Sequence, residues 1–129
     1  MIKIYDYYER NVNKNDFYYY TFNKEIELYF TFNEDFSYFD EEAIMSRFKM
    51  LTYPANELPE HECIEFIAIA FYLHNEGYYI DLFPNFLNRP TGVNDFSLTI
   101  RKYIIKQEGS YGVPVPWESR RTLADSMKF

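Results

Sequence analysis

Alternating apolar and polar residues mark the beginning of the chain as β-structure. In residues 25–32, EIELYFTF, the residues Ile, Leu and Phe alternate with Glu, Tyr and Thr, the period of a strand with one buried face. Residues 2–8 and 17–22 are also rich in Tyr, Phe and Ile, which favour strands. The sequence therefore predicts an antiparallel β meander over residues 1–32, followed by a connection over residues 33–40.

The pattern changes to a helical period after this connection. Ile44, Phe48 and Leu51 recur at the spacing that places side chains on one face of a helix. Asp40 has the side chain of an N-cap residue, whose oxygen accepts a hydrogen bond from the first turn. The sequence predicts a helix over residues 41–51.

The longest candidate for a single buried helix is residues 59–77, PEHECIEFIAIAFYLHNEG. Pro59 suits the first helical turn, where its missing N–H costs nothing, and Gly77 suits a left-handed C-cap. Glu65 is the only charged residue in the middle of this run, so the helix should lie centrally in the packing. A strand is the rival interpretation because the run is rich in Ile and Phe, but its length and the final glycine favour a helix.

The C-terminal half continues with shorter predicted elements. Residues 78–83 alternate like a short strand, and residues 95–107 have the apolar stripe of a helix with Asn94 as its N-cap. Arg101, Lys102 and Lys106 are expected toward the C-terminal end of this helix, where positive charge is favourable with the dipole. Residues 110–129 are expected to form a docked C-terminal tail.

These elements predict an α+β fold in which the N-terminal antiparallel β meander packs against three helices. The helices would form a single layer on a small sheet. The length of 129 residues fits one globular domain.

The acidic residues are concentrated in one part of the chain. Residues 34–65 contain nine acidic and two basic residues, so the whole net charge of −7 lies in this stretch. An acidic protein does not suit direct binding of nucleic acid, which requires a basic face. The acidic stretch can instead attract a basic protein, or it can be a solvated surface that only adds solubility.

The remaining features of the composition are a high aromatic content and a single cysteine. The chain contains 14 Tyr and 13 Phe, and aromatic side chains are enriched in binding surfaces, although a low-GC coding bias would favour the same residues. We expect no membrane contact, because the sequence has no run of about 18 uncharged apolar residues. The single cysteine and the absence of a signal-peptide pattern predict a cytoplasmic protein.

The candidate catalytic and metal motifs are weak. His61 and Glu65 lie one helical turn apart, but the second histidine of the zinc-protease motif is missing. Cys63 and His74 would be about 16 Å apart on one helix, too far for a nucleophile and its base. Adjacent acids usually serve helix starts, and no glycine-rich phosphate loop occurs. We therefore predict no catalytic residues, no metal and no cofactor.

These exclusions favour a non-enzymatic acidic binding protein, an immunity or inhibitor protein that masks a basic bacterial toxin nuclease. The alternatives are a phage- or plasmid-encoded anti-defence protein that inhibits a host nuclease, and a small enzyme or ligand-binding domain with an aromatic-lined site. A competing binding surface is the sheet face around Tyr18, Tyr20 and Tyr29. The expected partner-binding residues combine aromatic anchors with flanking acids: Tyr38, Phe39, Asp40, Glu41, Glu42, Tyr53, Glu57, Glu60 and Glu62.

Overall fold

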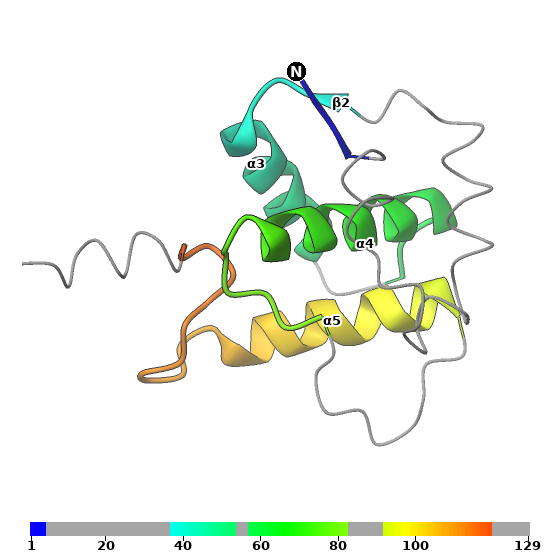
Figure 1. Cartoon of the computed structure of the whole chain (residues 1–129). Coiled ribbons are helices and arrows are strands. Elements are labelled where there is room, and N and C mark those ends of the chain that lie inside the picture. The colour runs from blue at the N-terminus through cyan, green and yellow to red at the C-terminus, as the bar shows by residue number, and fades with distance from the viewer. Residues whose placement is uncertain (5–36, 54–56, 83–91, 120–129) are drawn as a thin grey trace, which may run out of the picture.

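Three helices and a small sheet make up the part of the chain that the structure describes (Figure 1). This computed structural model describes residues 1–4, 37–53, 57–82 and 92–119. Its helices in chain order are α3 (Glu41–Thr52), α4 (Glu60–Asn75) and α5 (Val93–Gln107). With an antiparallel sheet beside these helices, the fold belongs to the α+β class that the sequence predicts.

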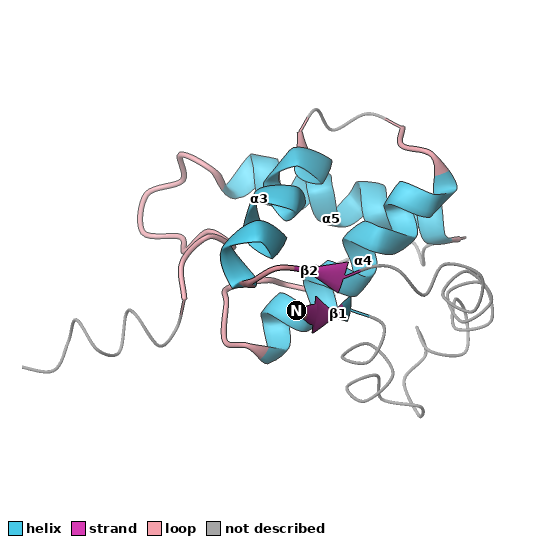
Figure 2. Ribbon diagram, turned by 90° about the horizontal axis from the view of Figure 1, so that it is seen from above, coloured by secondary structure: helices cyan, strands magenta, loops and turns pink. Residues whose placement is uncertain are grey.

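The sheet consists of two short strands, β1 (Ile2–Lys3) and β2 (Ser37–Tyr38), which pair antiparallel with Ile2 opposite Tyr38. Figure 2 shows them side by side next to the helices. β2 lies where the sequence predicts only a connection, because a strand of two residues is too short to show an alternating pattern. The strands predicted over residues 17–22 and 25–32 lie outside the described residues.

Helix α3 begins and packs as the sequence predicts. The Asp40 side chain accepts a hydrogen bond from the backbone N–H of Ala43 at 2.8 Å, which satisfies one of the free donors of the first turn. The predicted apolar stripe is buried at Ile44, Phe48 and Leu51. This face anchors α3 on the next helix.

Helix α4 is the centre of the described core, as predicted from its apolar length. It packs against both α3 and α5, and every residue from Cys63 to Ala70 is buried. Phe66 stacks on Phe48 of α3 with ring centroids 4.8 Å apart and planes 6° from parallel. Beyond the helix, Gly77 has a φ of 94°, the left-handed conformation that only glycine adopts readily.

Helix α5 begins two residues earlier than the sequence predicts. Its N-cap is Gly92, with an extended backbone and no side-chain capping hydrogen bond, and Asn94 lies inside the first turn. Glycine has no side-chain acceptor, so the sequence offered Asn94 as a more conspicuous but incorrect cap. The predicted core positions Phe96 and Ile100 are buried.

The strand predicted over residues 78–83 is not formed in its described part, which extends to residue 82. Tyr78 makes only an isolated antiparallel bridge with Ser119. The backbone N–H of Ile80 donates to the carbonyl of Tyr78 at 3.0 Å, and this i to i+2 bond forms a tight three-residue turn. The turn diverts the chain before a ladder can extend.

The described part of the predicted tail contacts the helices through Trp117. Its ring lies edge-on to Phe48 with centroids 5.9 Å apart and is tilted against Tyr53 at 6.3 Å. The ammonium of Lys49 lies 5.1 Å from the centre of the same ring, within the range of a cation–π interaction. None of the helices in the described ranges is long and apolar enough to cross a membrane.

Candidate functional site

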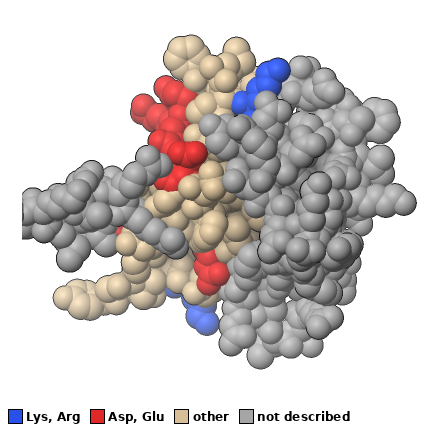
Figure 3. All heavy atoms as spheres, viewed as in Figure 1, with Lys and Arg blue, Asp and Glu red and all other residues tan. Residues whose placement is uncertain are grey.

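An exposed aromatic ring stands beside acidic side chains where α3 begins. Phe39 is 83% exposed, Asp40 and Glu42 are exposed, and Glu41 is half-buried. Figure 3 shows acidic side chains gathered on this side of the molecule. We call Phe39, Asp40, Glu41 and Glu42 the α3 acidic end.

The acids of the α3 acidic end serve the helix as well as the surface. Negative charge in the first turn is stabilised by the positive end of the helix dipole, and Asp40 also caps the helix. Phe39 makes no comparable contribution to folding, because most of its ring faces solvent. An exposed phenyl ring rimmed by carboxylates can therefore bind an apolar side chain that is flanked by basic groups.

Tyr38, which the sequence offers as an aromatic anchor, is held in a partly buried ion-pair cluster. Its hydroxyl donates a hydrogen bond to the Glu65 carboxylate. Arg47 donates to the other oxygen of that carboxylate from Nε at 3.1 Å and from Nη2 at 2.7 Å. Glu65 is only 5% exposed, and we call Tyr38, Arg47 and Glu65 the Glu65 cluster. It joins β2, α3 and α4.

The hydrogen bonds of the Glu65 cluster favour the protonated forms of Tyr38 and Arg47. Burial raises the pKa of Tyr38, and the hydrogen bond to Glu65 raises it further because a phenolate could not donate to a carboxylate. The hydrogen bond to Glu65 likewise raises the pKa of Arg47. Glu62, another predicted binding residue, is half-buried with its carboxylate 3.8 Å from Arg47 Nη2.

Tyr53 lies at the opposite end of α3 from Phe39, and the 12-residue helix between them is about 18 Å long at the standard helical rise. It is 39% exposed and packs on Trp117. Two causes raise the pKa of Tyr53 to about 12: burial, which is the larger, and a hydrogen bond with Glu108. The predicted anchors Phe39 and Tyr53 thus occur at two separate places on the surface.

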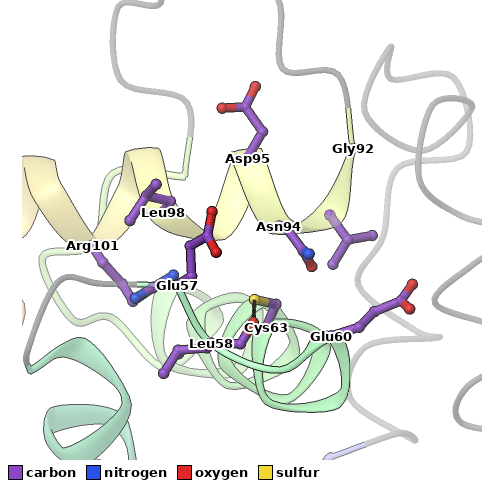
Figure 4. A pocket seen from close by; sticks show the side chains of 10 residues that line it. Glu57, Leu58, Glu60, Cys63, Gly92, Asn94, Asp95, Leu98 and Arg101 are labelled. Atoms are coloured by element: carbon purple, nitrogen blue, oxygen red, sulfur yellow. Dashed lines mark hydrogen bonds between the residues drawn. The ribbon is translucent and has the colours of Figure 1, made fainter.

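The remaining predicted residues, Glu57 and Glu60, are exposed at the mouth of a pocket of about 510 Å³. This pocket lies between the N-terminal ends of α4 and α5 (Figure 4). Residues 57–63 form one wall, and residues 92–101 form the other. Two segments about thirty residues apart in the chain therefore build one concave site, which no local sequence pattern indicates.

The buried guanidinium of Arg101 forms part of the pocket wall. Arg101 is 1% exposed, a burial that the sequence pattern of its helix did not indicate. Its Nε donates to the hydroxyl of Ser97 at 3.1 Å. Burial lowers the pKa of Arg101, since it disfavours the charged form. Burial also raises the pKa of the Cys63 thiol, which lies in the opposite wall and donates to the carbonyl of Leu58 at 3.6 Å.

A smaller hollow of about 360 Å³ lies at the C-terminal ends of α4 and α5. Tyr79 and Tyr103 line it together with His74 and Asp81, so its described lining is more aromatic than that of the pocket at the N-terminal ends. His74 Nδ1 lies 3.1 Å from the carbonyl oxygen of Ile80, which fixes the orientation of the imidazole ring.

The metal interpretation of His61 and Glu65 is not supported by their contacts. The Glu65 carboxylate is occupied by Arg47 and Tyr38, whereas His61 is exposed. Within the described ranges, no three His, Cys, Asp or Glu side chains are grouped so that they could hold a metal ion.

The sequence matches no protein-family model, and no curated protein or solved structure shows a significant match. Function is therefore inferred from the geometry and charge of this chain itself.

Proposed function

We propose that this protein is a non-enzymatic acidic binding protein, an immunity or inhibitor protein that masks a basic bacterial toxin nuclease in the cytoplasm. The observation that carries the proposal is the α3 acidic end, where a phenyl ring that is 83% exposed adjoins three carboxylates. A basic surface that normally contacts phosphates would meet those carboxylates, while an apolar side chain of the partner covers Phe39.

Charge and the aromatic ring would have separate effects on binding. The net charge of −7 attracts a basic partner over a distance and accelerates association, an effect that salt screens. Complete burial of a Phe side chain contributes about 1.5–3 kcal/mol, which mainly slows dissociation. The α3 acidic end contains both kinds of group within four consecutive residues.

The Glu65 cluster supports this proposal because it helps to hold the backbone next to Phe39 in place. Phe39 follows Tyr38, whose hydroxyl is bonded to Glu65, and precedes Asp40, which caps α3. Its backbone is thus held from both sides before any partner binds. An anchor that is positioned in advance loses less conformational freedom on binding, which favours affinity.

The anti-defence alternative relies on the same surface and the same physics. A small ligand-binding domain is the second candidate, which the pocket between α4 and α5 favours because charged groups of both signs line it. That pocket differs from the aromatic-lined site expected from the sequence, since the described residues that line it are aliphatic, polar or charged.

The test begins with affinity purification from the source cell and identification of the captured protein. Surface plasmon resonance with that partner then compares Glu42→Lys with Glu118→Lys, a second exposed glutamate whose reversal changes the net charge equally. Glu42→Lys should slow association and weaken its salt dependence more than Glu118→Lys does. Phe39→Ser should speed dissociation about tenfold or more.

Folding provides the control for these variants. Phe39→Ser and Glu118→Lys change exposed side chains, so their free energies of unfolding should stay within about 0.5 kcal/mol of the wild type. Glu42→Lys also reverses a favourable interaction with the helix dipole and should lower the free energy of unfolding by about 1–2 kcal/mol at most. If Glu42→Lys and Glu118→Lys associate at the same rate at low salt, and Phe39→Ser dissociates like the wild type, the α3 acidic end is not the binding surface.

A further inference from the structure

The hollow at the C-terminal ends of α4 and α5 combines aromatic rings with apolar and acidic side chains. At about 360 Å³ it has room for a small molecule. Figure 1 shows that α4 and α5 run in the same direction, so both helices end on the same side of the molecule. His74 in the last turn of α4 and Gln107 at the end of α5 both line the hollow. We call it the C-terminal hollow.

The helix ends favour a positive charge in the C-terminal hollow. Aligned peptide dipoles place partial negative charge at the C-terminal end of a helix, and the effect is strongest in the last turn. Asp81 adds a carboxylate to the lining, whereas the described residues of the lining include no lysine or arginine. A cation is therefore favoured over an anion in this space.

His74 contributes a hydrogen-bond acceptor to the same lining. Its Nδ1 lies 3.1 Å from the carbonyl oxygen of Ile80. Because a carbonyl oxygen can only accept a hydrogen bond, Nδ1 carries the proton of the ring. The lone pair of the neutral imidazole is then on Nε2, an acceptor that is compatible with a nearby cation.

Two tyrosine rings determine which kind of cation fits. Tyr79 follows α4 and Tyr103 belongs to α5, and both side chains are half-buried. The face of an aromatic ring attracts a cation within about 6 Å of the ring centre, and this attraction needs no hydrogen bond. The rest of the described lining is largely apolar: Ile80, Leu82, Val113 and Pro114. A quaternary ammonium group, whose charge is surrounded by methyl groups, can use aromatic and apolar surface together.

We propose that the C-terminal hollow binds a small quaternary ammonium ion. Its trimethylammonium group lies against Tyr79 and Tyr103, where the ring faces and the helix ends stabilise the positive charge. This mode of binding does not require an uncompensated charge at Asp81. The inference rests on the second candidate function, ligand binding, and does not involve the α3 acidic end, so the two can fail separately.

Amide NMR titrations of the full chain with three probes test the charge of the ligand. Choline carries the trimethylammonium group, 3,3-dimethylbutan-1-ol has the same shape without the charge, and phosphocholine adds a negative phosphate. Choline should shift amide signals of residues 79–82 and of the last turn of α5 at concentrations below about 10 mM. The neutral analogue should bind about tenfold more weakly, because it is not attracted to the ring faces. Phosphocholine should also bind more weakly than choline, because the helix ends repel its phosphate.

Matched variants test the role of the tyrosine rings. Tyr103→Leu should weaken choline about tenfold and leave the neutral analogue nearly unchanged, whereas Tyr103→Phe keeps the ring and should bind choline within about twofold of the wild type. Tyr79→Leu and Tyr79→Phe repeat the test on the second ring, so it remains informative even if Tyr103→Leu fails to fold. Tyr111→Leu changes a fully exposed tyrosine outside the described lining and should leave the affinity for choline unchanged.

Several results would overturn the proposal. These are no shift changes with choline up to about 10 mM, equal affinity for choline and its neutral analogue, or wild-type affinity for choline in folded Tyr103→Leu and Tyr79→Leu variants. Tighter binding of phosphocholine than of choline would contradict the preference for a cation. Shift changes confined to another part of the described surface would reject this site. None of these results depends on partner capture by Phe39 and its neighbours.

Discussion

Two side chains that normally carry charge are buried in this fold, and their surroundings differ. Glu65, 5% exposed, receives hydrogen bonds from Arg47 and Tyr38, which come from two other elements. Arg101, 1% exposed, donates to the hydroxyl of Ser97 on its own helix and lies in the wall of a pocket. Glu65 is paired with a charged side chain from another element, whereas Arg101 borders a pocket.

This difference concerns how each buried charge is compensated. Burial of a charge costs several kcal/mol unless it is paired and hydrogen-bonded. At Glu65 the pairing ties β2 and α3 to α4, so the cost is offset within the protein. At Arg101 the hydrogen bond to Ser97 stays within one helix, and the side chain lies in the wall of a pocket.

The largest effect that this comparison predicts is the loss of Arg47. Arg47→Met should lower the free energy of unfolding by about 3–5 kcal/mol, because it leaves the Glu65 carboxylate buried without its charged partner. Urea denaturation at pH 7 measures this loss. The double variant Arg47→Met/Glu65→Met should recover most of it, since both charges are then removed. A single variant as stable as the wild type would show that Glu65 is not held by this pair.

The helices could be predicted from the sequence because their signals are local. The α3 cap and stripe, and the run that forms α4, each lie within about twenty consecutive residues. The first turn of α5 was misplaced by two residues, because its cap is Gly92, which has no side-chain acceptor. The strand over residues 78–83 was predicted from alternation alone, which carries no information about the turn at Ile80.

The sites were predictable only where their residues are neighbours in the chain. The α3 acidic end consists of four consecutive residues, so sequence reasoning found its members together. The Glu65 cluster joins residues up to 27 positions apart, and Tyr38 proved to be a member of it instead of an exposed anchor. Arg101 follows the buried Ile100 directly, yet only the packing of α4 against α5 places it in a pocket wall.

A smaller effect is expected at the second buried charge. Arg101→Met should lower the free energy of unfolding by about 1–2 kcal/mol, less than Arg47→Met does, because an aliphatic side chain fills the same space and the hydroxyl of Ser97 that loses its donor is uncharged. The same urea titration that is used for Arg47→Met measures it. A loss as large as that of Arg47→Met would place Arg101 among the structural charges and remove the contrast between the two sites.

The smallest expected effect concerns the third member of the Glu65 cluster and is visible only at high pH. The pKa of Tyr38 is raised by burial and by its bond to Glu65. A raised pKa means that the unfolded chain loses the proton first, so this stability is complete below about pH 10 and declines as the pH rises further. Unfolding free energies measured between pH 9 and pH 11 should therefore fall less steeply in Tyr38→Phe than in the wild type, by the contribution of about one proton.

Tyr111→Phe, which changes a fully exposed tyrosine, is the matched control and should keep the wild-type slope. Equal slopes for all three proteins would mean that Tyr38 contributes nothing to closing the cluster around Glu65.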